Sequence, residues 1–297
     1  MVESAITSNI DKAQIVLLGA NYDKTSSFGK GANKGVNAIK LVLDTQIELY
    51  DRYVKNIPSE KLKIAFKNIT NLNKLSPEKM VAKIKLEYLQ LLEKNKFIIL
   101  IGGEHSVSNG PIQAINEKFT SNQITIVQID AHFDLRNDDS DYNDKPHGCY
   151  AHSTIMRRTN ELGFKLVQIG IRAYSKDELE YALKNKNTIS FFEWGNGEEL
   201  FTQPAINKII SSIKTKNVYL SIDVDGFDPS VMPETGTPVA GGLSWDYGVK
   251  LINKIFKERN VIGADIVEVA PHGTNSLAAY NAAQLLHNMI GQYSIKK

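Results

Sequence analysis

The stretch TIVQIDAHFDLR, residues 125–136, decides the fold. Its first half is apolar and β-branched, which is typical of a strand buried on both faces of a parallel sheet. Its charged residues come only afterwards, at the strand end where open α/β sheets place their ligand sites. Because alternate side chains of an extended chain share a face, Asp130, His132 and Asp134 can converge on one point. A bound cation would remove the cost of crowding them there. The alternative is a solvated loop with two helix-capping aspartates.

Two further apolar runs end in similar residues. The run VYLSIDVDGFD, residues 218–228, contains Asp223 and Asp225 two positions apart. The run FIILIGG, residues 97–103, is followed closely by His105. Each run alone could be purely structural. Three apolar strands that each end in a histidine or in paired aspartates instead predict a shared metal site.

The rest of the chain alternates strand and helix patterns. Strands are expected at 13–18, 63–69, 97–103, 124–130, 165–171, 188–194, 218–225 and 261–269. Helices are expected at 36–50, 77–93, 107–118, 204–213, 244–257 and 275–290. One further helix is expected to end at residue 158, and another to begin at residue 175. This alternation predicts an α/β protein with a parallel sheet covered by helices on both faces. A closed barrel shares the pattern. No break in composition divides the chain, so we expect residues 1–297 to form a single domain.

Composition and charge narrow the classes of function. The chain has 35 basic and 33 acidic residues, a net charge of +2, which does not indicate a nucleic-acid partner. No apolar run approaches the roughly 20 residues that cross a bilayer, and the N-terminal residues lack the pattern of a signal peptide. The single Cys149 excludes an intramolecular disulfide and fits a reducing compartment. We therefore expect a cytoplasmic protein without membrane or nucleic-acid partners, in which Cys149 is a small buried side chain.

Two polar stretches have more than one interpretation. Residues 19–35 are rich in glycine but match neither common nucleotide fingerprint, so we interpret them as a structured loop near the site. The acidic run NDDSDYNDK, residues 137–145, is typical of solvated surface. The same run would also form the entrance to a site at the strand ends.

Five motifs follow one another along the chain. They are Gly-Gly-Glu-His-Ser at 102–106, Asp-Ala-His-Phe-Asp at 130–134, His147-Gly148, Ser-Ile-Asp-Val-Asp-Gly-Phe-Asp-Pro at 221–229 and Val-Glu-Val-Ala-Pro at 267–271. This set resembles the ureohydrolases, the arginase and agmatinase family, over nearly the whole chain. The resemblance implies a three-layer α/β/α fold with a parallel sheet of about eight strands, which decides against the barrel. It also implies a homo-oligomer, a trimer or a hexamer.

The resemblance further implies two Mn²⁺ ions per chain. One ion would be held by His105, Asp130, Asp134 and Asp223, and the other by Asp130, His132, Asp223 and Asp225, with Asp130 and Asp223 bridging. Oxygen ligands with some imidazole suit Mn²⁺, although Co²⁺ or Ni²⁺ would also be accepted. Such a pair of ions makes hydroxide available near neutral pH by lowering the pKa of a shared water.

Three residues match catalytic positions of the family. Glu268 would bind the guanidinium group, because its two oxygens suit a planar fork of donors; a strand-end charge facing solvent is the alternative. Asp134 would steady the attacking hydroxide, and His147 would bind substrate and shuttle a proton to the leaving amine. The remaining histidines match no ligand position and are interpreted as structural or surface residues: His152, His272 and His287. His272, just after the Glu268 motif, is a candidate for a substrate contact.

The small-molecule guanidino substrate is inferred from loops around these motifs. Arginases bind the α-amino acid end through a Ser-Gly-Asn loop before His-Gly, and residues 142–146 differ from it. The run at 236–244 looks most like agmatinases, although Glu234 departs from the usual glycine. We therefore expect hydrolysis of agmatine to urea and putrescine, a step of polyamine biosynthesis. The alternatives are another guanidino compound such as guanidinobutyrate or arginine, a catalytically silent metal-binding relative, and a dinuclear phosphoesterase.

Overall fold

The computed structural model of the chain describes residues 6–7, 9–195, 205–273 and 275–296. Among these residues, nine strands form one sheet in the order β1-β3-β2-β4-β9-β8-β5-β6-β7, and every neighbouring pair is parallel. The strands are β1 (Ile6–Thr7), β2 (Ile15–Ala20), β3 (Ile64–Ile69), β4 (Phe97–Gly102), β5 (Ile124–Ile129), β6 (Lys165–Ile171), β7 (Ile189–Glu193), β8 (Asn217–Asp223) and β9 (Asn260–Val267).

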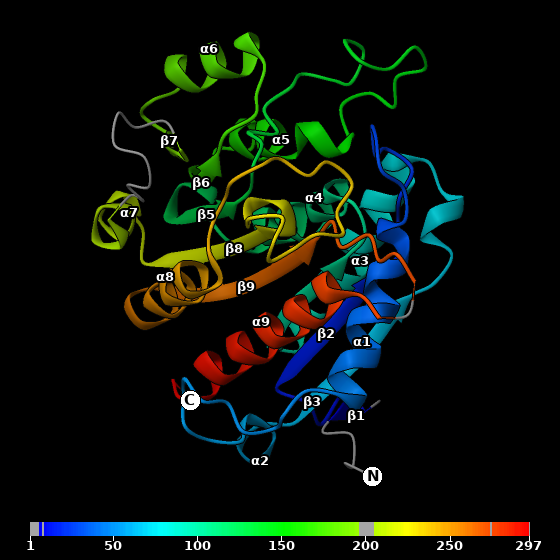
Figure 1. Cartoon of the computed structure of the whole chain (residues 1–297), viewed down its shortest axis with the longest axis vertical. Helices are drawn as coiled ribbons and strands as arrows, with labels where there is room; N and C mark the ends of the chain where they lie inside the picture. The colour runs from blue at the N-terminus through cyan, green and yellow to red at the C-terminus, as the bar shows by residue number, and fades with distance from the viewer. Residues whose placement is uncertain (1–5, 8, 196–204, 274, 297) are drawn as a thin grey trace.

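Helices cover both faces of the sheet. The first face is covered by α1 (Gly35–Thr45), α7 (Ile206–Ser212), α8 (Trp245–Glu258) and α9 (Leu277–Ser294), and the second by α3 (Pro77–Glu93), α4 (Asn109–Lys118), α5 (Ile155–Glu161) and α6 (Lys176–Lys184). The short α2 (Pro58–Lys61) contacts α9. Figure 1 shows α1, α8 and α9 in front of the sheet and α3 behind it. The predicted three-layer α/β/α architecture is confirmed, and none of the described helices could span a membrane.

Strand β2 shows why the apolar runs form a sheet between two cores. Ile15 and Leu17 belong to the core under α1 and α9, whereas Val16 and Leu18 belong to the core under α3 and α4. All four side chains are fully buried. Since burying one such side chain stabilises the fold by about 1.5–3 kcal/mol, strands that are apolar on both faces are strongly favoured in the middle layer.

Several details differ from the prediction. Strand β1 has only two residues and α2 only four, too few for a periodic pattern to be visible in the sequence. The helix expected from 107 begins at Asn109, because the Glu104 side chain accepts a hydrogen bond from the Ser106 N–H and favours a 3-10 turn first. Cys149 is exposed, so its interpretation as a buried side chain was wrong.

The strand order brings the motifs together. The chain passes from β4 to β5 across two positions of the sheet, which β9 and β8 later fill. Strands β4, β9, β8 and β5 are therefore adjacent, and their carboxyl ends meet at one edge of the sheet. Ligand sites of open α/β sheets form at such a point.

Candidate metal centre

All six residues predicted as metal ligands meet at these carboxyl ends. His105 lies in the 3-10 turn after β4, and Asp130, His132 and Asp134 directly follow β5. Asp223 is the last residue of β8, and Asp225 lies in the 3-10 turn Val224–Gly226. That turn packs closely on the β5 end: a Cβ atom on Gly226 would lie 2.6 Å from the Asp130 nitrogen, so glycine is required there.

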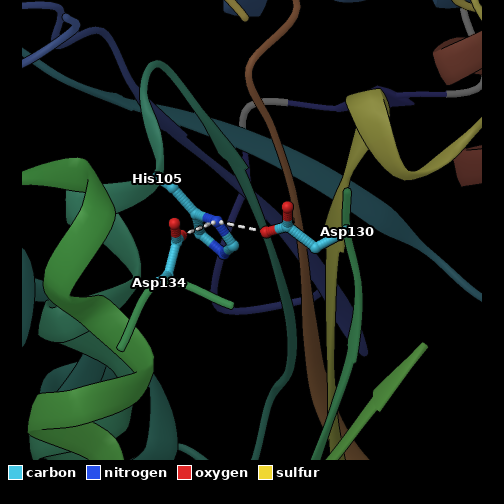
Figure 2. A group of neighbouring side chains, drawn as sticks. All are labelled: His105, Asp130 and Asp134. Carbon is cyan, nitrogen blue, oxygen red and sulfur yellow. Dashed lines mark ion pairs between the residues drawn. The ribbon is translucent and has the colours of Figure 1, made fainter. Parts of the chain in front are cut away.

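The first ligand group surrounds the Nδ1 atom of His105. This atom lies 3.2 Å from Asp130, 3.0 Å from Asp134 and 3.3 Å from Asp223, measured to carboxylate oxygens. Figure 2 shows the imidazole ring between Asp130 and Asp134. The Nδ1 atom is buried and has no hydrogen-bond partner among the described residues. An unpaired nitrogen facing three carboxylates fits a bound metal ion, which would supply its missing partner.

The second ligand group surrounds the Nδ1 atom of His132. This atom lies 3.1 Å from Asp225 and 3.5 Å from Asp130. Asp130 belongs to both groups: its Oδ2 atom faces His105, and its Oδ1 atom faces His132. This is the placement expected of a carboxylate shared by two ions.

The electrostatics of the metal-free centre are those of crowded acids and bases. Burial and the charge of Asp130 raise the pKa of Asp134 to about 6. Burial, with Asp225 and Asp130 nearby, also raises the pKa of Asp223 well above its ordinary value. For His105, burial alone would lower the pKa, but the three facing carboxylates outweigh it and raise the pKa. Without cations, the centre would therefore balance part of its negative charge by retaining protons on His105 and Asp223.

Metal binding is expected to weaken as the pH falls, because protons compete for His105, His132 and Asp223, whose pKa values are raised, and for Asp134, whose pKa is raised to about 6. The ligands bind metal in their deprotonated forms, so each ion must displace protons and its affinity must rise with pH. Calorimetric titration with Mn²⁺ in two buffers of different ionisation enthalpy would count the released protons. An affinity that is independent of pH, with no proton release, would contradict this description.

Two residues of the centre have unusual backbone conformations. Asp134 has φ of 53° and Glu268 has φ of 67°, both in the left-handed region. Such a conformation costs a non-glycine residue on the order of 1–3 kcal/mol and is often found at functional sites. The strain redirects the chain at the ends of β5 and β9, and it marks both residues as functional candidates.

Glu268 is buried next to the first ligand group. Its side chain is 3% exposed, and its Oε1 atom accepts a hydrogen bond of 2.8 Å from the His105 N–H. The alternative of a strand-end charge facing solvent is thereby excluded. A second acid, Glu104, is fully buried nearby, and burial together with the charge of Glu268 raises its pKa to about 7.

A cavity of about 390 Å³ opens beside the two ligand groups. Its lining includes His132, Asp134, Asp223 and Asp225 from the centre, and His152, Tyr142 and Tyr174 from the surrounding loops. A small substrate in this cavity would contact the metal centre directly.

The two histidines of the following loop lie in different places. His147 is not among the described residues that line the cavity; its Nδ1 atom and its N–H bond Asp139, both within 2.9 Å. His152 lines the cavity, and its Nδ1 atom lies 3.7 Å from Glu268. Burial would lower the pKa of His152, but Glu268 and Asp134 raise it. The interpretation of His152 as a structural or surface residue therefore missed its position. The sequence does not indicate which of the two histidines reaches the cavity, because both lie in the segment that precedes α5.

Asp139 shows that the acidic run 137–145 is more than solvated surface. Its side chain is fully buried, and it also accepts hydrogen bonds from the Gly148 N–H and the Asn143 amide. The loop is thereby closed around one carboxylate. Its Tyr142 side chain reaches the cavity and hydrogen-bonds Ser153 at 2.7 Å, so the loop forms part of the rim of the site.

The glycine-rich N-terminal loop is structured and touches the site, as interpreted from the sequence. The Thr25 hydroxyl accepts a hydrogen bond of 2.9 Å from the His152 N–H, and the Thr25 N–H donates to Glu104 at 3.4 Å. Glu234 has a structural position: its Oε2 atom accepts a hydrogen bond of 2.7 Å from the Ala278 N–H at the start of α9. His272 is exposed.

Comparison with known proteins agrees with this geometry. Residues 13–291 match the family model of the Arginase family. The chain belongs to this family. The N(1)-aminopropylagmatine ureohydrolase of Synechocystis is 36% identical over 295 residues, which cover 97% of this chain and 92% of that protein. The agmatinase of Bacillus subtilis is 31% identical, covering 94% and 92%.

The fold of this arginase-family chain is also found in a solved structure. The agmatine ureohydrolase of Thermoplasma volcanium superposes with a TM-score of 0.80 at 25% identity, covering 98% of this chain and 93% of that one. The resemblance predicted from the five motifs is therefore confirmed, and the protein is a hydrolase of the ureohydrolase type.

Proposed function

We propose that this arginase-family hydrolase uses two Mn²⁺ ions to cleave the guanidino group of an agmatine-type compound into urea and an amine. The observation that carries the proposal is the pair of ligand groups that share Asp130 and border a cavity. One ion would be held by His105, Asp130, Asp134 and Asp223. The other would be held by Asp130, His132 and Asp225, with Asp223 as a further shared ligand. The oxygen-rich ligands suit Mn²⁺. Two bound ions supply Lewis acidity that lowers the pKa of a water towards neutrality.

The chain's own residues would bind and orient the guanidinium group. Its carbon is a poor electrophile because three nitrogens share the positive charge, so the group must be held firmly for attack. In this proposal Glu268, buried beside the first ligand group, binds the guanidinium group, since a buried carboxylate forms strong charge-assisted hydrogen bonds with a fork of N–H donors. Asp134 borders the same cavity and would accept a hydrogen bond from the attacking water.

A proton must also reach the leaving amine, and we propose His152 for this step in preference to His147. His152 lines the cavity and lies next to Glu268, whereas His147 is held by Asp139. Substituting His152→Asn is expected to lower kcat about 10²- to 10⁴-fold, the usual contribution of a general acid. His147→Asn should have a much smaller effect. Steady-state urea release by both variants, each checked for metal content, makes the comparison. A larger loss in His147→Asn would favour the original sequence prediction.

The substrate is expected to be the N(1)-aminopropyl derivative of agmatine, with agmatine as the second candidate. The relative from Synechocystis that carries the first name is 36% identical, and the agmatinase from Bacillus subtilis is 31% identical. The cavity also offers the aromatic ring of Tyr174, which suits the one additional ammonium group of the aminopropyl compound.

Urea release from the two polyamines, guanidinobutyrate and arginine, offered side by side, tests this preference. We expect kcat/KM to be about 10-fold higher for the aminopropyl compound than for agmatine, since one well-placed cation contact of about 1–2 kcal/mol has that effect. A preference for agmatine would restore the expectation from the sequence. Absence of urea with every guanidine, in the metal-loaded protein, would indicate a catalytically silent relative.

A further inference from the structure

A chain of hydrogen bonds leads from the metal centre into the sheet. The Nε2 atom of His105 lies 2.9 Å from the Ser221 hydroxyl. The Ser221 hydroxyl donates to Asp265 at 2.8 Å, and the Tyr219 hydroxyl donates to the other oxygen of Asp265 at 2.9 Å. All four residues are at most 1% exposed. The mechanism proposed above uses His105 but gives no reason for the buried acid behind it.

The sheet itself fixes the geometry of this chain. Ser221 on β8 pairs in register with Asp265 on β9. Tyr219 lies two positions before Ser221, so that both side chains share one face of the strand. Asp265 is thus an acidic residue in the middle of two buried, otherwise largely apolar strands. Burying a carboxyl group there costs free energy unless it is hydrogen-bonded. An acid retained at such a position is therefore a candidate for a specific role.

The directions of the hydrogen bonds determine the tautomer of His105. The Ser221 hydroxyl has a single proton, and it donates that proton to Asp265. The Ser221 oxygen must then accept from His105, which requires a proton on Nε2. A neutral imidazole with its proton on Nε2 presents the lone pair of Nδ1. That lone pair faces Asp130, Asp134 and Asp223, where the proposed ion would bind.

We propose that Asp265 is a positioning residue that acts through Ser221 to fix the ring orientation and tautomer of His105. It thereby sets the affinity of the ion that His105 holds. This proposal rests on the metal centre proposed above. The ion of the His132 group is affected less, because the chain of hydrogen bonds reaches only His105. Acceptors behind a ligating histidine commonly have this function in metal sites.

Calorimetric titration of the metal-free protein with Mn²⁺ tests the proposal without reference to substrate. Asp265→Asn keeps the shape of the side chain but removes its charge, and Ser221→Ala removes the link. Each is expected to weaken the binding of one of the two ions about 10- to 100-fold. The double variant should lose no more than the worse single variant, because both changes interrupt one pathway. Tyr219→Phe, which removes a hydrogen bond to Asp265 without touching Ser221, is the matched control and should change affinity much less.

Two results would overturn the proposal. One is unchanged affinity for both ions in folded Asp265→Asn and Ser221→Ala, as judged by circular dichroism. The other is equal weakening of both ions together with a lower melting temperature, which indicates a purely structural role. Failure of the proposed function is distinguishable from either: a wild-type protein that binds two ions but releases no urea would refute the catalytic proposal and leave the positioning role of Asp265 standing.

Discussion

Replacing Asp130 with asparagine is expected to abolish urea release and to leave fewer than two metal ions per chain. Asp130 belongs to both ligand groups, with one carboxylate oxygen 3.2 Å from His105 and the other 3.5 Å from His132. An amide offers only one oxygen, so it can complete one group but not both. Loss of the several kcal/mol that a metal contributes to the transition state corresponds to a rate reduction of about 10³-fold or more.

The measurement pairs metal content with urea release for the same preparation. Asp144→Asn is the matched control, because Asp144 is an exposed aspartate in the neighbouring acidic run and belongs to neither ligand group. It should retain two ions and full activity. An Asp130→Asn protein that still binds two ions and turns over substrate normally would show that Asp130 is not a shared ligand.

Replacing Glu268 with glutamine is expected to lower kcat/KM about 10²- to 10³-fold while both metal ions remain bound. The range is that seen when one preorganised electrostatic contact to a transition state is removed. Glutamine preserves the shape and can still accept the hydrogen bond from the His105 N–H, so the centre should stay intact. What is lost is the negative charge that pairs with the guanidinium group.

Glu104→Gln provides a control for this variant, because Glu104 is equally buried in the same region and its oxygens accept hydrogen bonds from Ser106. Steady-state kinetics and metal content should be measured for both proteins. If the two substitutions reduce kcat/KM equally, the assignment of Glu268 to the guanidinium group is wrong.

The sequence predicted which histidine and aspartate side chains gather at the strand ends, because their positions follow from regular structure. At an extended strand end, residues two positions apart point to the same side. The spacing of Asp130, His132 and Asp134 therefore predicts that their side chains lie together, and the same holds for Asp223 and Asp225. Each pattern needs only the knowledge that parallel strands end at a common edge.

Residues that depend on long-range packing were not predictable in this way. Asp139 looks like any member of an acidic run, and its burial depends on how the loop closes around His147. His152 and His147 differ only in where the tertiary structure places them. Asp265 lies within a strand pattern, and its partner Ser221 becomes visible only when the register of β8 against β9 is known.

The most direct test of the central claim is a stepwise Mn²⁺ titration of the metal-free protein, with urea release from N(1)-aminopropylagmatine and from agmatine measured at each step. The two-ion centre predicts activity that rises with occupancy and reaches its plateau at two bound ions per chain. Full activity with one ion, or no urea from either substrate with two ions bound, would contradict it.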